Sequence, residues 1–68
     1  MFMQAVISSN VAAIGYDKAS QVLRVQFKSG GIYEYSGVRE ALFKEMLEPH
    51  PWRRVGREVK VHPTRKIG

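Results

Sequence analysis

The sequence predicts a small α+β protein with an antiparallel sheet of three strands, or four if a further short strand joins, covered on one face by one helix. Two patterns predict this class: the alternation in "VLRVQFK" and the apolar stripe in "SGVREALFKEMLEP". The 68 residues include no cysteine, so a modest apolar core must stabilise the fold without disulfides. We therefore expect a single domain over residues 1–68, with a sheet-and-helix body at 3–48 and a basic C-terminal segment at 49–68.

Three strands are expected in the first part of the chain. Residues 3–7 are a short candidate, the turn-prone "SSN" follows, and "VAAIGY" at 11–16 is the second candidate. The clearest strand is "VLRVQFK" at 22–28, where apolar and polar side chains alternate with the period of two that a half-buried strand requires.

The stretch "SGGIYEY" at 29–35 raises the question of which face its two tyrosines occupy. A two-residue turn would direct Tyr33 and Tyr35 to the solvent face and push Glu34 into the core. Burying an unpaired carboxylate costs several kcal/mol, on the order of magnitude expected for such groups. We therefore prefer the register that keeps Glu34 on the solvent side, opposite Gln26.

That preferred register needs a turn of three residues, Ser29–Gly31. Such turns favour a left-handed residue at their last position, which Gly31 supplies without steric cost. It sets Phe27 opposite Tyr33 and Val25 opposite Tyr35. The tyrosines are then expected on the core face of the sheet, with their hydroxyls near its rim.

One helix is expected to cover this core face. It begins near Ser36 or Val38 and ends before Pro49, because the residue before a proline is disfavoured in the helical region. Its apolar stripe consists of Val38, Leu42, Phe43, Met46 and Leu47.

The positive charge of the chain is concentrated at its C-terminal end. Residues 1–48 carry five basic and five acidic side chains, whereas residues 49–68 carry six basic side chains against Glu58, so the whole net charge of +5 lies there. A neutral body with a basic end suits a phosphate-binding surface, because bound cations release counterions from a nucleic acid. A solvated tail that keeps the protein soluble is the alternative.

The basic segment also contains apolar side chains that can dock it onto the body: Trp52, Val55, Val59, Val61 and Ile67. Pro51 and Pro63 limit regular structure in it. The stretch "REVKV" is compatible with a short edge strand or with a helical turn, and the sequence leaves both open.

The order of "SSNVAAIGYD", "LRVQFKSGGIYEY" and a following helix resembles the KTSC domain over about residues 6–48. The domain takes its name from the C-terminus of some lysyl-tRNA synthetases and also occurs as stand-alone proteins. The resemblance implies that Tyr33, Tyr35 and Tyr16 are family signature residues packed in the core, and it suggests RNA as a ligand. The chain departs from the family pattern at Arg39, where a proline is common, and after Gly56, where an aromatic pair is missing.

We therefore expect a nucleic-acid-binding module of low sequence specificity, with RNA as the ligand. The expected phosphate contacts are Arg53, Arg54, Arg57, Lys60, Arg65 and Lys66, and Trp52 is expected to stack on a base. A protein-interaction module remains the alternative, recruiting an acidic partner or associating with itself through a sheet edge.

No enzymatic activity, cofactor or metal site is expected. His50 and His62 are the only side chains that ordinarily titrate near neutral pH, and no nucleophile is arranged with them. The chain shows no secretory signal and no apolar run long enough to span a bilayer, so a cytoplasmic protein without membrane association is expected.

Overall fold

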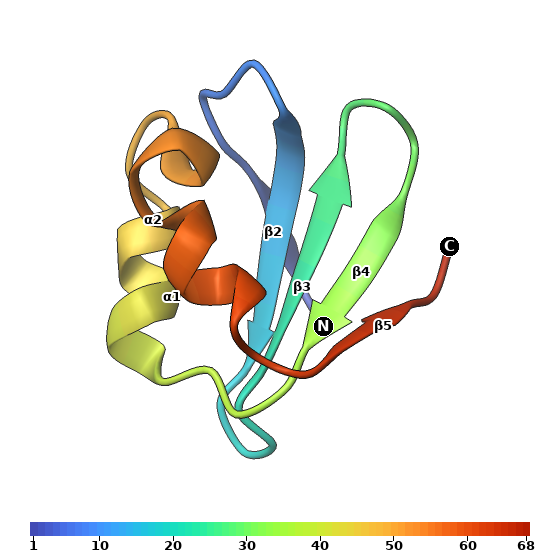
Figure 1. Cartoon of the computed structure of the whole chain (residues 1–68), viewed down its shortest axis with the longest axis vertical. Helices are drawn as coiled ribbons and strands as arrows, with labels where there is room; N and C mark the ends of the chain where they lie inside the picture. The colour runs from blue at the N-terminus through green and yellow to red at the C-terminus, as the bar shows by residue number, and fades with distance from the viewer.

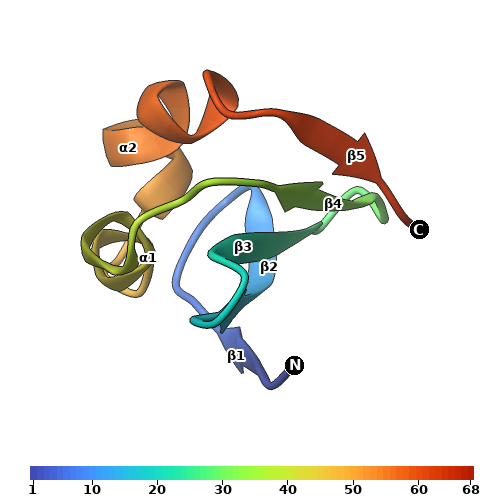
Figure 2. The same cartoon turned by 90° about the horizontal axis from the view of Figure 1, so that it is seen from below.

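The computed structural model describes all of residues 1–68 as an antiparallel five-stranded sheet with two helices on one of its faces (Figures 1 and 2). The strands are ordered β1-β2-β3-β4-β5 in the sheet, which is also their order in the chain. The elements are β1 (Met3–Ala5), β2 (Val11–Asp17), β3 (Val22–Phe27), β4 (Ile32–Tyr35), α1 (Glu40–Met46), α2 (Pro51–Lys60) and β5 (Thr64–Lys66).

The expectation of three or four strands and one helix is wrong in number, because residues 49–68 add α2 and β5 to the fold. The first four residues of the "REVKV" stretch belong to α2, and Val61 is its C-cap. Val55 and Val59, four residues apart on α2, are both buried in the core. Residues 49–68 are thus a structural part of the domain rather than a segment appended to a finished body.

The predicted face of the two tyrosines is confirmed. Tyr33 lies opposite Val25, and Tyr35 lies opposite Leu23. Opposed residues share a face, so both tyrosines lie on the side of the sheet that the helices cover. Each tyrosine lies opposite a residue two positions earlier in β3 than predicted. Side chains alternate between faces with a period of two, so this shift leaves every side chain on its predicted face.

The displacement arises in the turn between β3 and β4. The Phe27 N–H donates to the Gly31 carbonyl at 2.8 Å, and the Gly30 N–H donates to the Phe27 carbonyl at 2.9 Å. Three residues, 28–30, therefore form the turn instead of 29–31. Gly30, with φ +111°, is the residue that takes the positive φ, and both strands shift accordingly.

Glu34 lies opposite Arg24 and not opposite Gln26. Arg24 donates to Glu34 Oε2 from Nη2 at 2.6 Å and from Nε at 3.1 Å, while Arg65 Nη2 donates to Oε1 at 3.0 Å. The hydrogen bonds from Arg24, and then those from Arg65, lower the pKa of Glu34 below its ordinary value. This ion pair network joins three neighbouring strands on the face that carries no helix.

The core lies between the sheet and the two helices. α1 begins at Glu40, later than expected, because Arg39 has an extended backbone. The predicted apolar side chains do pack toward the core, with Val38 and Met46 fully buried and the others half-buried, but Val38 precedes α1 and Leu47 follows it. The nine buried hydrophobic residues are Val11, Ile14, Leu23, Val25, Tyr35, Val38, Met46, Val55 and Val59.

Tyr16 links β2 to the segment before α1. Its hydroxyl donates to the Val38 carbonyl at 2.5 Å, and its ring stacks on Phe43 with a centroid distance of 4.8 Å and an interplanar angle of 9°. Burial raises the pKa of this phenol. Tyr16 therefore has a packing role, as expected.

Neither helix is long and apolar enough to cross a membrane.

Candidate functional site

Helix α2 carries an exposed basic stripe. The helix begins at Pro51, after His50 in the left-handed region (φ 55°). Proline is suited to the first turn of a helix, where its missing N–H has no partner to lose. Arg53, Arg57 and Lys60 follow at steps of four and three residues, which places them along one side of the helix, and all three are exposed.

Three aromatic rings from three elements form a row beside this stripe. Phe27 on β3 packs edge-on against Trp52 on α2, with a centroid distance of 4.9 Å and an angle of 83°. On its other side, Phe27 packs edge-on against Tyr33 on β4 at 5.6 Å and 79°. All three residues are half-buried. We call Trp52, Phe27 and Tyr33 the aromatic row.

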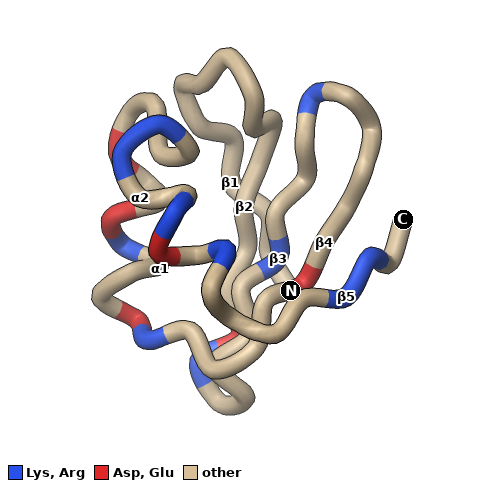
Figure 3. Tube along the Cα trace, viewed as in Figure 1, with Lys and Arg blue, Asp and Glu red and all other residues tan.

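Lysines flank the aromatic row. Lys60 Nζ lies 5.8 Å from the centroid of the Trp52 ring. Lys66 on β5 lies directly opposite Tyr33, so the two side chains leave the sheet on the same face. Exposed Lys28 follows Phe27 in the turn. Figure 3 shows the resulting arrangement, with basic positions along α2, along β5 and at the turn of the hairpin between them.

Two glycines make room for the outer rings of the row. A Cβ atom on Gly56 would lie 2.9 Å from Trp52 Cδ2, and a Cβ atom on Gly31 would lie 2.9 Å from Tyr33 Cε1. Both distances are closer than side-chain carbons normally approach. The Trp52 ring therefore packs directly on the backbone of Gly56, and the Tyr33 ring packs directly on the backbone of Gly31. These contacts fix the positions of both rings beside the cations.

Two of the six predicted phosphate contacts are engaged within the protein. Arg54 binds the Glu45 carboxylate at 3.1 Å and the carbonyls of Glu45 and Pro49 at 2.6 and 3.0 Å. Arg65 binds Glu34. The other four cations, Arg53, Arg57, Lys60 and Lys66, take part in no ion pair.

The predicted aromatic residues divide between the core and this surface. Tyr35 is 5% exposed, and burial raises the pKa of its phenol. Trp52 is half-buried and also packs against Tyr35, at a centroid distance of 6.2 Å. Phe27, Tyr33 and Lys28 are not among the residues predicted to contact a ligand. Their proximity depends on the pairing of β5 with β4 and on the docking of α2, which alternation within one strand does not reveal.

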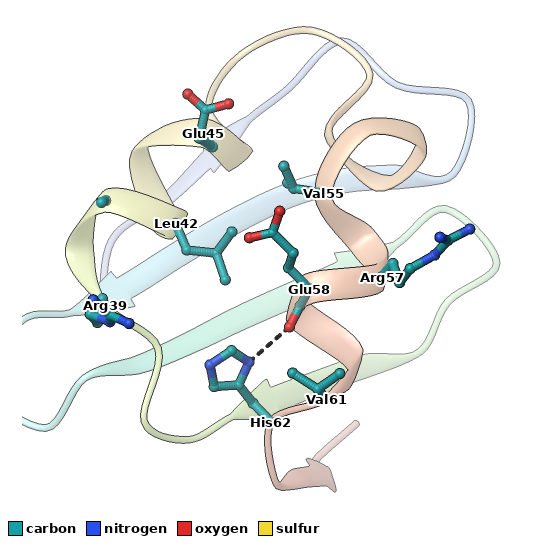
Figure 4. A pocket seen from close by; sticks show the side chains of 9 residues that line it. Arg39, Leu42, Glu45, Val55, Arg57, Glu58, Val61 and His62 are labelled. Carbon is teal, nitrogen blue, oxygen red and sulfur yellow. Dashed lines mark hydrogen bonds between the residues drawn. The ribbon is translucent and has the colours of Figure 1, made fainter.

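A groove lies on the other side of α2, between the two helices (Figure 4). Its volume is about 550 Å³, and its lining includes Leu42, Val55, Glu58 and His62. Glu58 points into this groove, and Arg57, which also contributes to the lining, extends its guanidinium group away from it. The single acidic residue of α2 is thereby separated from the basic stripe.

The two histidines lie beyond opposite ends of α2. His50 is exposed at the start of α2, and His62 lies just after its end, with Nδ1 3.0 Å from the backbone carbonyl of Glu58. No group of three or more histidine or acidic side chains is placed to hold a metal ion.

Comparisons of the sequence and of the structure with known proteins both match the same family. The model of the KTSC domain matches residues 7–50. An uncharacterised protein of Stutzerimonas stutzeri (strain A1501) is 39% identical over 44 residues, covering 65% of this chain and 62% of the relative, which is less than two thirds of its length. A protein of Tsukamurella paurometabola is 42% identical over 45 residues, covering 66% of this chain and 67% of the relative.

The match to a solved structure extends further along the chain. The crystal structure of a KTSC domain protein from Yersinia pestis superposes with a TM-score of 0.89 at 33% identity, covering 98% of this chain and 97% of the other. The family model ends near the start of α2, but the structural match includes α2 and β5. These two elements are therefore shared with that relative.

Proposed function

Since this chain belongs to the KTSC domain family, we propose that it binds single-stranded nucleic acid, with RNA as the ligand, through the aromatic row and the cations around it. The observation that carries the proposal is the row itself, three half-buried rings with Lys60 at one end and Lys66 at the other. Stacking surfaces combined with cations are what non-specific single-strand binders use.

The cations provide the affinity in this proposal. Arg53, Arg57 and Lys60 on α2 and Lys66 on β5 contact phosphates, because none of them is held by a carboxylate of the protein. The acidic side chains nearest to the proposed binding surface, Glu58 and Glu34, point away from it. Glu58 points into the groove between the helices, and Glu34 is bound to two arginines on the opposite face of the sheet.

Tyr33 and Trp52 provide stacking surfaces for bases. A stacked base contributes roughly 1–3 kcal/mol to binding. The surface is made of cations and rings, and such contacts position a strand without reading base edges, so binding tolerates different sequences. RNA is the ligand we favour because KTSC domains occur at the C-terminus of some lysyl-tRNA synthetases.

The test compares the affinity of the protein for single-stranded RNA, transfer RNA and duplex DNA, measured by fluorescence anisotropy at two salt concentrations. We expect binding to RNA that weakens as salt rises, with the logarithmic slope reduced by about 0.7 for each phosphate contact removed from a single strand. The test variant carries Arg53→Gln, Arg57→Gln and Lys60→Gln. It should bind every single strand more weakly and show a smaller salt slope.

The control variant carries Lys18→Gln, Arg39→Gln and Lys44→Gln. It loses the same three charges from exposed positions outside the aromatic row and α2. We expect it to retain nearly all of the affinity and salt dependence of the original protein. Equal losses in the two variants would mean that net charge alone binds RNA, and no binding at low salt would contradict the proposal outright.

A further inference from the structure

The two edges of the sheet differ in charge. Residues 1–16, which include the edge strand β1, contain no charged side chain, although the chain has a net charge of +5. The opposite edge strand, β5, carries Arg65 and Lys66. Lysine and other charges on an edge strand oppose pairing with a further strand, and β1 lacks this protection. Apart from the α-ammonium group of Met1, no charged group of residues 1–16 repels a second copy of this cationic protein.

Exposed apolar side chains surround the unprotected edge. Phe2 is 79% exposed, Ile7 is 68% exposed and Met1 is 49% exposed. Gln4 lies opposite the core residue Ile14, so even-numbered positions including Phe2 face the helix side. Met1 lies on the other side, where its side chain is beside Gly15, and Ile7 lies beyond the end of β1, where its carbonyl accepts the His50 N–H at 2.6 Å. Apolar surface therefore borders the edge on both faces of the sheet.

The backbone of β1 can accept another strand. The Val6 N–H donates to the Ala12 carbonyl at 3.4 Å, which directs the peptide groups of the even positions toward β2. Hydrogen bonding alternates along an antiparallel pair, so the N–H and carbonyl groups of Met3 and Ala5 point away from the sheet. These groups are available to a neighbouring strand.

We propose that this edge pairs with the same edge of a second copy, forming a symmetric dimer with a continuous ten-stranded sheet. Gln4 lies on the twofold axis, opposite Gln4 of the second copy. In this register Met3 pairs with Ala5 of the second copy, which brings outward-pointing peptide groups together. Phe2 then faces Val6. Every cross-strand pair other than the central glutamines is apolar.

The symmetry has a further geometric consequence. A twofold axis between antiparallel strands is perpendicular to the sheet, so the helices of both copies lie on the same face. The aromatic rows lie at the two outer ends of the joined sheet, because β1 and the β4–β5 pair are at opposite edges of each copy. The dimer proposal does not depend on nucleic acid binding.

The first test is sedimentation equilibrium of the full chain over a concentration series reaching about 0.5 mM, which covers micromolar dissociation constants. We expect a mass that rises to twice that of one chain and stops there. A protein that remains monomeric throughout would overturn the proposal. Continued growth of the mass would also overturn it, because pairing of β1 with β5 of the next copy generates an open filament.

Matched variants locate the contact. Phe2→Lys adds one charge at the β1 edge, and Val61→Lys adds one charge at a similarly exposed apolar residue (78%) after α2. We expect Phe2→Lys to raise the dimer dissociation constant at least about tenfold and Val61→Lys to raise it by less than about threefold. Ala5→Pro removes an outward N–H that would bond to the second copy, so it should also dissociate the dimer. The monomer should still fold, because proline is tolerated where an edge N–H faces solvent.

The chain contains no cysteine, so a single introduced thiol reports on the twofold axis. Gln4→Cys should form a disulfide-linked dimer on mild oxidation, because the two Cα atoms at a non-hydrogen-bonded pair are about 4.5 Å apart. Val61→Cys is the control. Equal cross-linking of the two variants would contradict the proposed register even if the protein were dimeric.

Discussion

Arg24 binds Glu34 through two hydrogen bonds to a single carboxylate oxygen, at 2.6 and 3.1 Å, on the face of the sheet that carries no helix. The Glu34 side chain is only 12% exposed. This contact joins β3 to β4, and the bond from Arg65 to the same carboxylate joins β5 to β4. A carboxylate so placed contributes to stability only while it is ionised.

We expect Glu34→Gln to lower the free energy of unfolding by roughly 1–3 kcal/mol at neutral pH, because charge-assisted hydrogen bonds are lost. The pKa of Glu34 is lowered from its ordinary value of 4.5, so the contribution is fully present above that value and is lost as pH falls through the folded-state pKa. Urea unfolding at several pH values checks this. A constant difference between the two proteins down to the lowest pH would contradict it.

Gly56→Ala should destabilise the protein, although alanine is the better helix former by about 1 kcal/mol. The new Cβ would lie 2.9 Å from Trp52 Cδ2 and would displace the ring from its place beside Phe27. Thermal unfolding followed by circular dichroism measures the change. The control is the same substitution in a Trp52→Ala background, where relief of the contact should make alanine neutral or stabilising. Destabilisation in both backgrounds would mean that the indole is not the cause.

Tyr16→Phe should reduce stability by about 1 kcal/mol, since it removes the hydrogen bond to the Val38 carbonyl but keeps the ring that stacks on Phe43. Tyr33→Phe is the matched control, because the Tyr33 hydroxyl makes no hydrogen bond within the protein. It should leave the urea midpoint nearly unchanged. Equal effects of the two substitutions would show that the Tyr16 hydroxyl bond is not the source of the loss.

Tyr33→Leu and Tyr35→Leu should have different consequences, although the residues share a strand and a face. Tyr35 is buried and contacts the aromatic row only through Trp52, so its substitution should cost about 2 kcal/mol of stability and lower the RNA affinity of the folded protein less than the substitution of Tyr33. Tyr33 is half-buried in the aromatic row, so its substitution should weaken RNA binding about tenfold. Anisotropy and urea unfolding on both variants separate these effects. Lost affinity in Tyr35→Leu alone would reverse the assignment.

The faces of β3 and β4 could be predicted because the free-energy cost of burying Glu34 decided between the two possible registers of the hairpin. Placing Glu34 on the core side would bury a carboxylate without a partner, and that penalty exceeds any difference between turn types. The exact partners could not be predicted in the same way. Gly30 and Gly31 are equally able to adopt a positive φ, and only closure of the hairpin selects Gly30.

The C-terminal elements were harder to predict for two different reasons. The spacing of Trp52, Val55 and Val59 does indicate a helical face, and Pro51 is suited to a helix start, so α2 was recognisable in principle. Strand β5 was not. Its residues, Thr64–Lys66, have no apolar alternation, and their pairing depends on contacts with β4 and Glu34. Four of the six predicted cations remain available to a ligand, while Arg54 and Arg65 have structural partners.

The aromatic row joins residues that are 25 positions apart in the chain, Phe27 and Trp52, and it exists only when β3, β4 and α2 have all docked. Binding and folding are therefore thermodynamically linked, because a ligand that engages the row selects the native state over the unfolded ensemble. Saturating RNA should raise the melting temperature. A core substitution that touches no ligand would still lower apparent affinity once unfolded molecules become populated, so variants should be compared well below their melting temperatures.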